Sequence, residues 1–112
     1  PLAEAWRPTW VLISAGFDAH RADPLTHLGL TAGDFADLTA RIAGLVPAGR
    51  RIALLEGGYD LDALATSAGA CVAGLAGELW RPEPATGAGP GLEVVGAAVQ
   101  LRAQVAAEPA DN

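Results

Sequence analysis

Two short polar stretches of this chain combine residue types that could perform chemistry. The first, SAGFDAHRADP at 14–24, gathers carboxylate, imidazole and guanidinium groups, and the second, EGGYD at 56–60, places a tyrosine after two glycines. Each follows a short apolar run, and open parallel sheets bind their ligands beyond the carboxyl ends of the strands. If both runs are strands of one sheet, the two loops begin about 5 to 10 Å apart. Asp18 and Tyr59 could then reach one common ligand.

Each of these residues has a chemical and a structural interpretation. Asp18 could bind a metal, act as a general base or make local hydrogen bonds, and a catalytic zinc needs about three protein ligands. His20 would point to the same side in an extended segment, but a solvated or structural histidine is the favoured interpretation. Gly57 and Gly58 would let the backbone approach a ligand, or would simply permit a tight turn. Tyr59 could donate its hydroxyl to a developing oxyanion, or could be a packed residue with one hydrogen bond.

Local signals predict a strand–helix–strand unit that would hold the two stretches at one edge. The runs Trp10–Ile13 and Ile52–Leu55 are apolar on consecutive residues, which favours parallel strands covered on both faces. A helix is expected to start at Thr31, whose hydroxyl can form a capping box with Asp34, and to end near Pro47. The connection should be right-handed.

The rest of the chain is expected to be helical on either side of a Pro- and Gly-rich stretch. A helix at 61–77 should direct five residues inward: Leu61, Leu64, Ala68, Val72 and Leu75. Another helix is expected at about 92–107. We predict three parts, with 1–80 as the body of two strands and two helices, 81–91 as a linker, and 92–112 as a C-terminal helix and tail. Because two parallel strands alone do not make a stable sheet, we expect the C-terminal part of a larger α/β domain.

Composition limits the partners and the compartment. The formal net charge of −6 argues against nucleic acid and against an anionic membrane surface. No apolar run reaches the roughly 18 residues of a membrane span. The only cysteine, Cys71, cannot form an internal disulfide, so we expect a reducing, cytoplasmic compartment and a small core residue at this position. The composition does not decide whether the chain forms oligomers.

In context, the two stretches read WVLISAGFDAHRADPLTHLGLT and RIALLEGGYDLDALATS. They closely resemble the C-terminal part of the histone deacetylase superfamily, in its class II-like branch with bacterial acetylpolyamine amidohydrolases. The resemblance runs from about Trp10 to Gly77. It implies an arginase-like, three-layer α/β/α fold with a parallel sheet. It also implies hydrolysis of an acylated lysine or a small acylated amine by one zinc ion and a water, although the sequence does not distinguish zinc from another divalent metal.

The resemblance assigns roles to single residues. Asp18 falls on a zinc-ligand aspartate of the family, and Tyr59 falls on the tyrosine that donates to the carbonyl oxygen and its tetrahedral intermediate. Leu25 falls on the leucine that lines the acyl channel. Gly57 and Gly58 match the glycine loop at the wall of that channel. These five positions are the candidate site.

The chain departs from the family pattern at 22–27, where ADPLTH stands in place of the usual GDPLGG. The missing glycines stiffen this loop and leave the acyl preference open. The family's paired histidines and its Asp-x-His ligands lie upstream of the residues present, and the ligand role is not carried onto His20. We expect the intact protein to be a zinc-dependent deacetylase or amidohydrolase and the isolated chain to be inactive. The alternative is a non-catalytic binding or interaction module that retains the fold.

Overall fold

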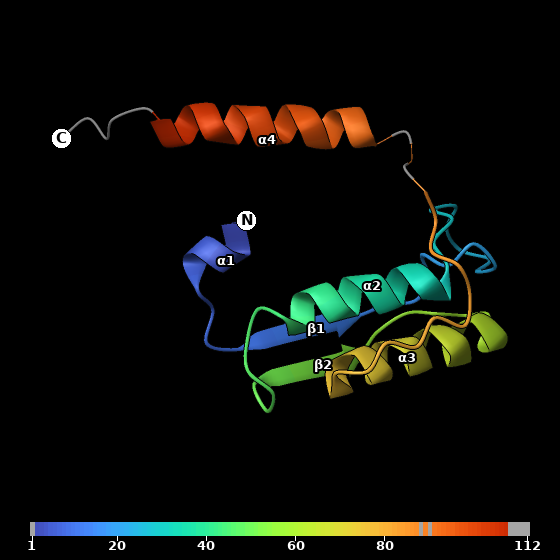
Figure 1. Cartoon of the computed structure of the whole chain (residues 1–112). Coiled ribbons are helices and arrows are strands. Elements are labelled where there is room, and N and C mark those ends of the chain that lie inside the picture. The colour runs from blue at the N-terminus through green and yellow to red at the C-terminus, as the bar shows by residue number, and fades with distance from the viewer. Residues whose placement is uncertain (1, 88, 90, 108–112) are drawn as a thin grey trace.

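The chain folds on two parallel strands, as its apolar runs predict. The computed structural model describes residues 2–87, 89 and 91–107, and Figure 1 labels the elements of this part. They are α1 (Leu2–Trp6), β1 (Val11–Ala15), α2 (Ala32–Ala43), β2 (Arg51–Leu55), α3 (Leu61–Ala76) and α4 (Leu92–Ala107). β1 and β2 pair in parallel, with Val11 opposite Arg51 and Ala15 opposite Leu55. The carboxyl ends of both strands therefore meet at one edge, and the predicted α/β class with a parallel sheet is confirmed.

The core lies on one face of the strand pair, where α2 and α3 pack. Ala15 at the end of β1 and Phe17 in the loop after it are buried together with Phe35 of α2 and Cys71 of α3. The rings of Phe17 and Phe35 meet edge to face with their centroids 5.1 Å apart, and such a pair contributes about 1 kcal/mol beyond its buried area. Cys71 is a small buried core residue, and its sulfur accepts a hydrogen bond from the Thr39 hydroxyl at 3.2 Å.

The opposite face of the strand pair is exposed within the described residues. Side chains alternate between the two faces along a strand, and Leu12, Ile52 and Leu54 lie on the side away from Ile13 and Ala15. All three are exposed. The described part of the chain thus forms two layers, and the third layer of an arginase-like α/β/α fold stays a prediction.

The start of α2 follows the sequence prediction, and its end comes earlier. The expected capping box is present, because the N–H of Asp34 donates to Oγ1 of Thr31 and the N–H of Thr31 donates to Oδ2 of Asp34. The helix ends at Ala43 rather than near Pro47, because Gly44 forms the C-cap. A turn closed by the N–H of Arg50, which donates to the carbonyl of Pro47 at 3.3 Å, then leads into β2.

α3 packs partly through residues that we expected, since Leu64, Ala68 and Leu75 are partly buried against the core, and partly through small side chains. Leu61 and Val72 are 79% and 64% exposed, so their predicted inward placement is wrong. The buried positions of the helix are Ala63, Ser67, Ala70, Cys71 and Gly74. A β-carbon built on Gly74 would lie 3.0 Å from Cγ2 of Thr39 on α2. The small residues therefore allow the two helices to approach closely.

Beyond α3 the chain runs back to the start of α2. Gly77 ends the helix in the left-handed conformation, and Trp80 then covers Gly69, where a built β-carbon would come within 2.6 Å of the indole ring. Residues 81–86, here called the strap, have no regular secondary structure. α4 lies apart from the strand pair in Figure 1 with its described side chains exposed. Among the described residues, no helix has the length and apolar character needed to cross a membrane. The division at 80/81 and 91/92 stays a prediction.

Candidate active site

The loops that follow β1 and β2 contact each other directly. The N–H of Phe17 donates to the carbonyl of Gly57 at 2.8 Å, and the N–H of Glu56 donates to the carbonyl of Ala15 at 3.0 Å. These bonds continue the parallel ladder beyond the strand ends, so both loops leave the sheet in fixed register. The two polar stretches therefore lie side by side at the carboxyl edge, where open parallel sheets bind their ligands.

Asp18 lies in the first loop with its side chain against the second. A β-carbon built on Gly57 would come within 3.2 Å of both Cγ and Oδ1 of Asp18, so a larger residue at 57 would displace the carboxylate. Asp18 is half-buried, and within the described residues no group donates a hydrogen bond to its carboxylate. The Thr26 hydroxyl fixes its backbone by donating to the Asp18 carbonyl at 2.7 Å. The carboxylate is therefore held in place and remains able to bind a ligand.

Tyr59 follows a glycine with a backbone conformation that other residues rarely adopt. Gly58 has a φ of 136°, and a β-carbon there would lie 3.2 Å from Cβ of Phe17. The Tyr59 residue is 61% exposed, and its hydroxyl has no hydrogen-bond partner in the described part of the chain. The structure thus places Asp18 and Gly57 in contact, whereas the phenol of Tyr59 extends into open space from the same pair of loops.

Asp23 connects the two loops through both of its carboxylate oxygens. Oδ1 accepts from the N–H of Leu25 at 2.9 Å, and Oδ2 accepts from the N–H of Tyr59 at 2.7 Å. Only 6% of Asp23 is exposed. Burial alone would raise its pKa, but these two N–H groups and that of Asp60, with the neighbouring His20, hold the pKa of Asp23 below its ordinary value. The Asp23 carboxylate therefore fixes the backbones of both Leu25 and Tyr59. The side chain of Leu25 is exposed.

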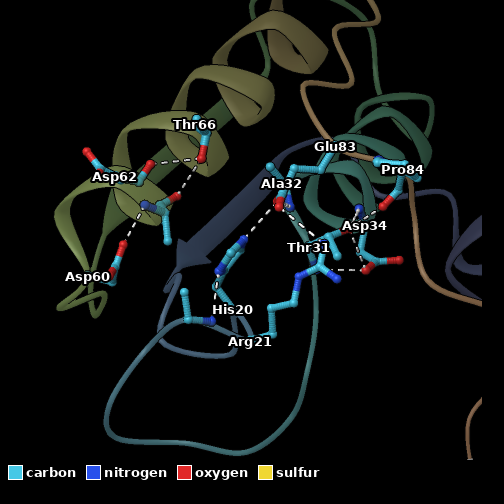
Figure 2. A network of polar contacts seen from close by, with 12 residues as sticks. His20, Arg21, Thr31, Ala32, Asp34, Asp60, Asp62, Thr66, Glu83 and Pro84 are labelled. Atoms are coloured by element: carbon cyan, nitrogen blue, oxygen red, sulfur yellow. Dashed lines mark hydrogen bonds and ion pairs between the residues drawn. The ribbon is translucent and has the colours of Figure 1, made fainter.

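His20 is buried, and both of its ring nitrogens are engaged (Figure 2). Nε2 lies 2.8 Å from Oε2 of Glu83 in the strap, and Nδ1 accepts a hydrogen bond from the N–H of Ala22 at 3.2 Å. Because Nδ1 is the acceptor, Nε2 is assigned the proton and donates it to Glu83. Neither nitrogen is left for a metal, so His20 has the structural role that we favoured.

Glu83 holds the strap against the first loop and the start of α2. Its Oε2 also accepts from the N–H of Ala32 at 2.7 Å, and its Oε1 accepts from the Arg21 guanidinium at 3.2 Å. The N–H of Ala32 and the ring of His20 are the main causes that lower the pKa of Glu83 to about 2 from its ordinary 4.5. Burial opposes this change, and Arg21 adds to it. The carboxylate is therefore ionised at any physiological pH.

Residues at the start of α2 fix the rest of the strap, as Figure 2 shows in part. The Thr31 hydroxyl donates to the carbonyl of Pro84 at 2.8 Å. Oδ1 of Asp34 accepts from the N–H and from the hydroxyl of Thr86, at 2.9 and 3.0 Å. Burial raises the pKa of Asp34, but the donors of Thr31 and Thr86 outweigh it and lower the pKa overall. The strap, which lies in the stretch we expected to be a linker, thus packs on both α2 and the first loop.

The described residues fit one position of a metal site and do not complete it. Within them, no group of three or more His, Cys, Asp or Glu side chains comes together, whereas a catalytic zinc takes about three protein ligands. Asp18 fits as one ligand, because its carboxylate is half-buried and accepts no hydrogen bond from the described chain. Further ligands would have to come from outside these residues.

Two residues that organise this edge were not assigned a role from the sequence. Asp23 carries a local signal, since an Asp that accepts from the N–H two residues later forms an Asx-turn, and Asp-Pro sequences favour such turns. Glu83 carries none, because its partner His20 lies 63 positions away. No periodicity or turn rule reports a pairing at that distance along the chain.

The parallel strand pair covered by α2 and α3 places this chain in the α/β class, with a half-buried carboxylate and a glycine–tyrosine loop at its carboxyl edge as the candidate site. The histone deacetylase domain matches residues 1–75, so the chain belongs to that family. The resemblance predicted from the two polar stretches is confirmed.

Relatives and a solved structure agree with this membership. Histone deacetylase 10, chloroplastic, of Oryza sativa subsp. japonica is 46% identical over 70 residues, which cover 60% of this chain and 16% of that protein. A probable deacetylase of Methanothermobacter thermautotrophicus is 42% identical over 88 residues, covering 77% of this chain and 25% of that protein. The crystal structure of the HDA15 HD domain matches with a TM-score of 0.77 and 36% identity, over 94% of this chain and 29% of that one. The chain thus spans a small part of each relative.

Proposed function

We propose that this chain is part of a metal-dependent deacetylase that hydrolyses the amide of an acetylated lysine or of a small acylated amine such as an acetylpolyamine. The observation that carries the proposal is the Asp18 carboxylate, half-buried against Gly57 and without a donor in the described chain. Membership of the histone deacetylase family supports the reaction class. The relatives reported above carry deacetylase names, which favours a hydrolase over a non-catalytic binding module.

Asp18 would hold the metal as one of its ligands. A zinc ion, or another divalent metal in its place, would polarise the amide carbonyl and lower the pKa of a bound water. The part played by Asp18 is to present a carboxylate in fixed orientation, since its backbone is held by Thr26 and its side chain rests on Gly57.

Tyr59 would donate its hydroxyl to the oxyanion that develops as the amide carbonyl is attacked. Such a donor must be neutral and must point toward open space that a substrate can enter, and the exposed phenol meets the second condition. One donor of this kind accounts for about 100- to 1,000-fold in kcat. Leu25, whose backbone N–H donates to Asp23, has an exposed side chain and would line the acyl channel. The backbone of Gly57 and Gly58 would form part of the wall of that channel.

The test uses the longest natural protein that contains this sequence, assayed with acetyl-lysine peptides and acetylated polyamines. Asp18→Ala should remove bound metal and turnover together, because a ligand is lost. Tyr59→Phe should keep the metal and lower kcat by about 100-fold or more. The matched control is Asp62→Ala, which removes an exposed carboxylate in the first turn of α3 and should change neither quantity.

The results separate the two roles. Full metal content in Asp18→Ala would contradict the ligand role, and an unchanged kcat in Tyr59→Phe would contradict the oxyanion role. We expect the 112-residue chain alone to bind zinc weakly and to hydrolyse none of these substrates. Zinc-dependent turnover by that chain would show that the site needs no further residues.

A further inference from the structure

Asp23 joins the two candidate loops, and the chemistry proposed above leaves it without a part. One oxygen turns the chain at Leu25, and the other holds the N–H of Tyr59 at 2.7 Å. An ionised acceptor makes hydrogen bonds that are shorter and about twice as strong as neutral ones. The bond to Tyr59 spans 36 positions of sequence and links the loop after β1 to the loop after β2.

The position of Tyr59 depends on its backbone, because its side chain has little to pack against. The residue is 61% exposed and its hydroxyl is unpartnered within the described residues. On one side stand Gly57 and Gly58, which lack a β-carbon and restrict the chain least. On the other side Asp60 is fixed as the N-cap of α3, accepting from the N–H of Ala63 at 2.8 Å. The bond to Asp23 therefore supplies the restraint that the glycines do not.

Asp18 is held by the same loop that carries Asp23. The loop that carries Asp23 is tied to it by the bond from the Thr26 hydroxyl to the Asp18 carbonyl, at 2.7 Å. We propose that Asp23 is a positioning residue that fixes Tyr59 and Leu25 relative to Asp18. The inference rests on the proposed function, in which Tyr59 is the oxyanion donor and Leu25 lines the acyl channel.

The test is a double-mutant cycle between Asp23→Asn and Tyr59→Phe in the longest natural protein that contains this sequence. Asn keeps the shape of Asp, but its amide nitrogen cannot accept, so one of the two N–H groups loses its partner. We expect Asp23→Asn to lower kcat by about 10- to 100-fold, as a small misplacement of a catalytic group does. Bound metal should stay unchanged. In the Tyr59→Phe background the same substitution should lower kcat by less than about 3-fold, because the phenol that it positions is absent.

The outcomes distinguish this inference from the proposed function. Equal losses of kcat in both backgrounds, with Tyr59→Phe itself impaired, would overturn the positioning role alone, since a merely structural residue acts independently of the phenol. An unchanged kcat in Tyr59→Phe would overturn the proposed function and this inference with it. Asp62→Asn is the control for the charge change, and it should leave kcat as it is.

A second change covers the case in which Asp23→Asn does not fold. Replacing the amide N–H of Tyr59 by an ester oxygen removes the donor and keeps both the phenol and the Asp23 carboxylate. A loss of about 10-fold or more in kcat with the metal retained is expected, and an unchanged kcat would overturn the positioning role. Because Leu25 shares the same carboxylate, Asp23→Asn should also change the ratio of kcat/KM between acetyl and longer acyl substrates. An unchanged ratio would overturn the part of the inference that concerns Leu25.

Discussion

Replacing Glu83 by glutamine should remove most of what the strap contributes to stability at neutral pH. Glutamine keeps the size of the side chain but loses the charge that attracts the N–H of Ala32 and the ring of His20. The pKa of Glu83, about 2 against an ordinary 4.5, corresponds to about 3 kcal/mol of folding free energy. Because 29% of the side chain is exposed, solvent screens part of this interaction, and we expect about 2 kcal/mol.

The loss should depend on pH in a defined direction. The pKa of Glu83 is lower in the folded state, so its contribution is complete above about pH 5 and decreases as the pH falls toward about 2. A protonated glutamate resembles glutamine, so the unfolding free energies of the wild type and Glu83→Gln should converge there. The pKa values of Asp23 and Asp34 are lowered as well, but these residues are present in both proteins and cancel in the difference.

The measurement is urea unfolding followed by circular dichroism at several pH values. At pH 7, Glu83→Gln should lower the free energy of unfolding by about 2 kcal/mol, seen as a lower urea midpoint with an unchanged dependence on urea concentration. At pH 3 the loss should be about half of that or less. Glu78→Gln makes the same chemical change at an exposed position after α3 and should stay within about 0.5 kcal/mol of the wild type. A shift equal to that of Glu78→Gln, or one that does not vary with pH, would refute the reasoning.

Two further substitutions test how the strap is held to α2. Gly33→Ala should cost about 1 to 3 kcal/mol by overpacking, because a β-carbon there would lie 2.6 Å from a backbone nitrogen of the strap. Gly96→Ala, with no atom nearby, is its control in urea unfolding, and equal midpoints for the two would contradict this packing. Asp34→Ala should cost more than the ~1 kcal/mol of a lost helix cap, since it also releases Thr86. A cost of about 1 kcal/mol or less would mean that Thr86 contributes nothing.

The parts of this fold that the sequence predicted are those decided by neighbours along the chain. The capping box of Thr31 and Asp34, for example, needs only a spacing of three residues along the chain. Short apolar runs at 10–13 and 52–55 identified both strands, although the first strand itself continues to Ala15. The helices and strands could therefore be predicted from local hydrogen bonds and residue propensities.

The packing of α3 could not be predicted in the same way. Periodicity places Leu64 and Leu75 correctly against the core, but Leu61 and Val72 are exposed. The close contact with α2 uses the small residues Cys71 and Gly74, which both meet Thr39. A stripe of small residues carries a weak hydrophobic signal, although it permits the shortest distance between two helices. The face that a helix buries then depends on its partner, which the helix sequence does not contain.

The glycine pair was recognised as a motif from the sequence, but the contacts that require glycine at these two positions were not. Gly57 and Gly58 were interpreted either as a close approach to a ligand or as a tight turn. In the structure, a β-carbon at 57 would meet the Asp18 carboxylate, and one at 58 would meet Phe17. The first loop therefore requires both glycines before any substrate is considered. A residue larger than glycine at 57 would displace the candidate metal ligand and the candidate channel wall together, so the two cannot vary independently.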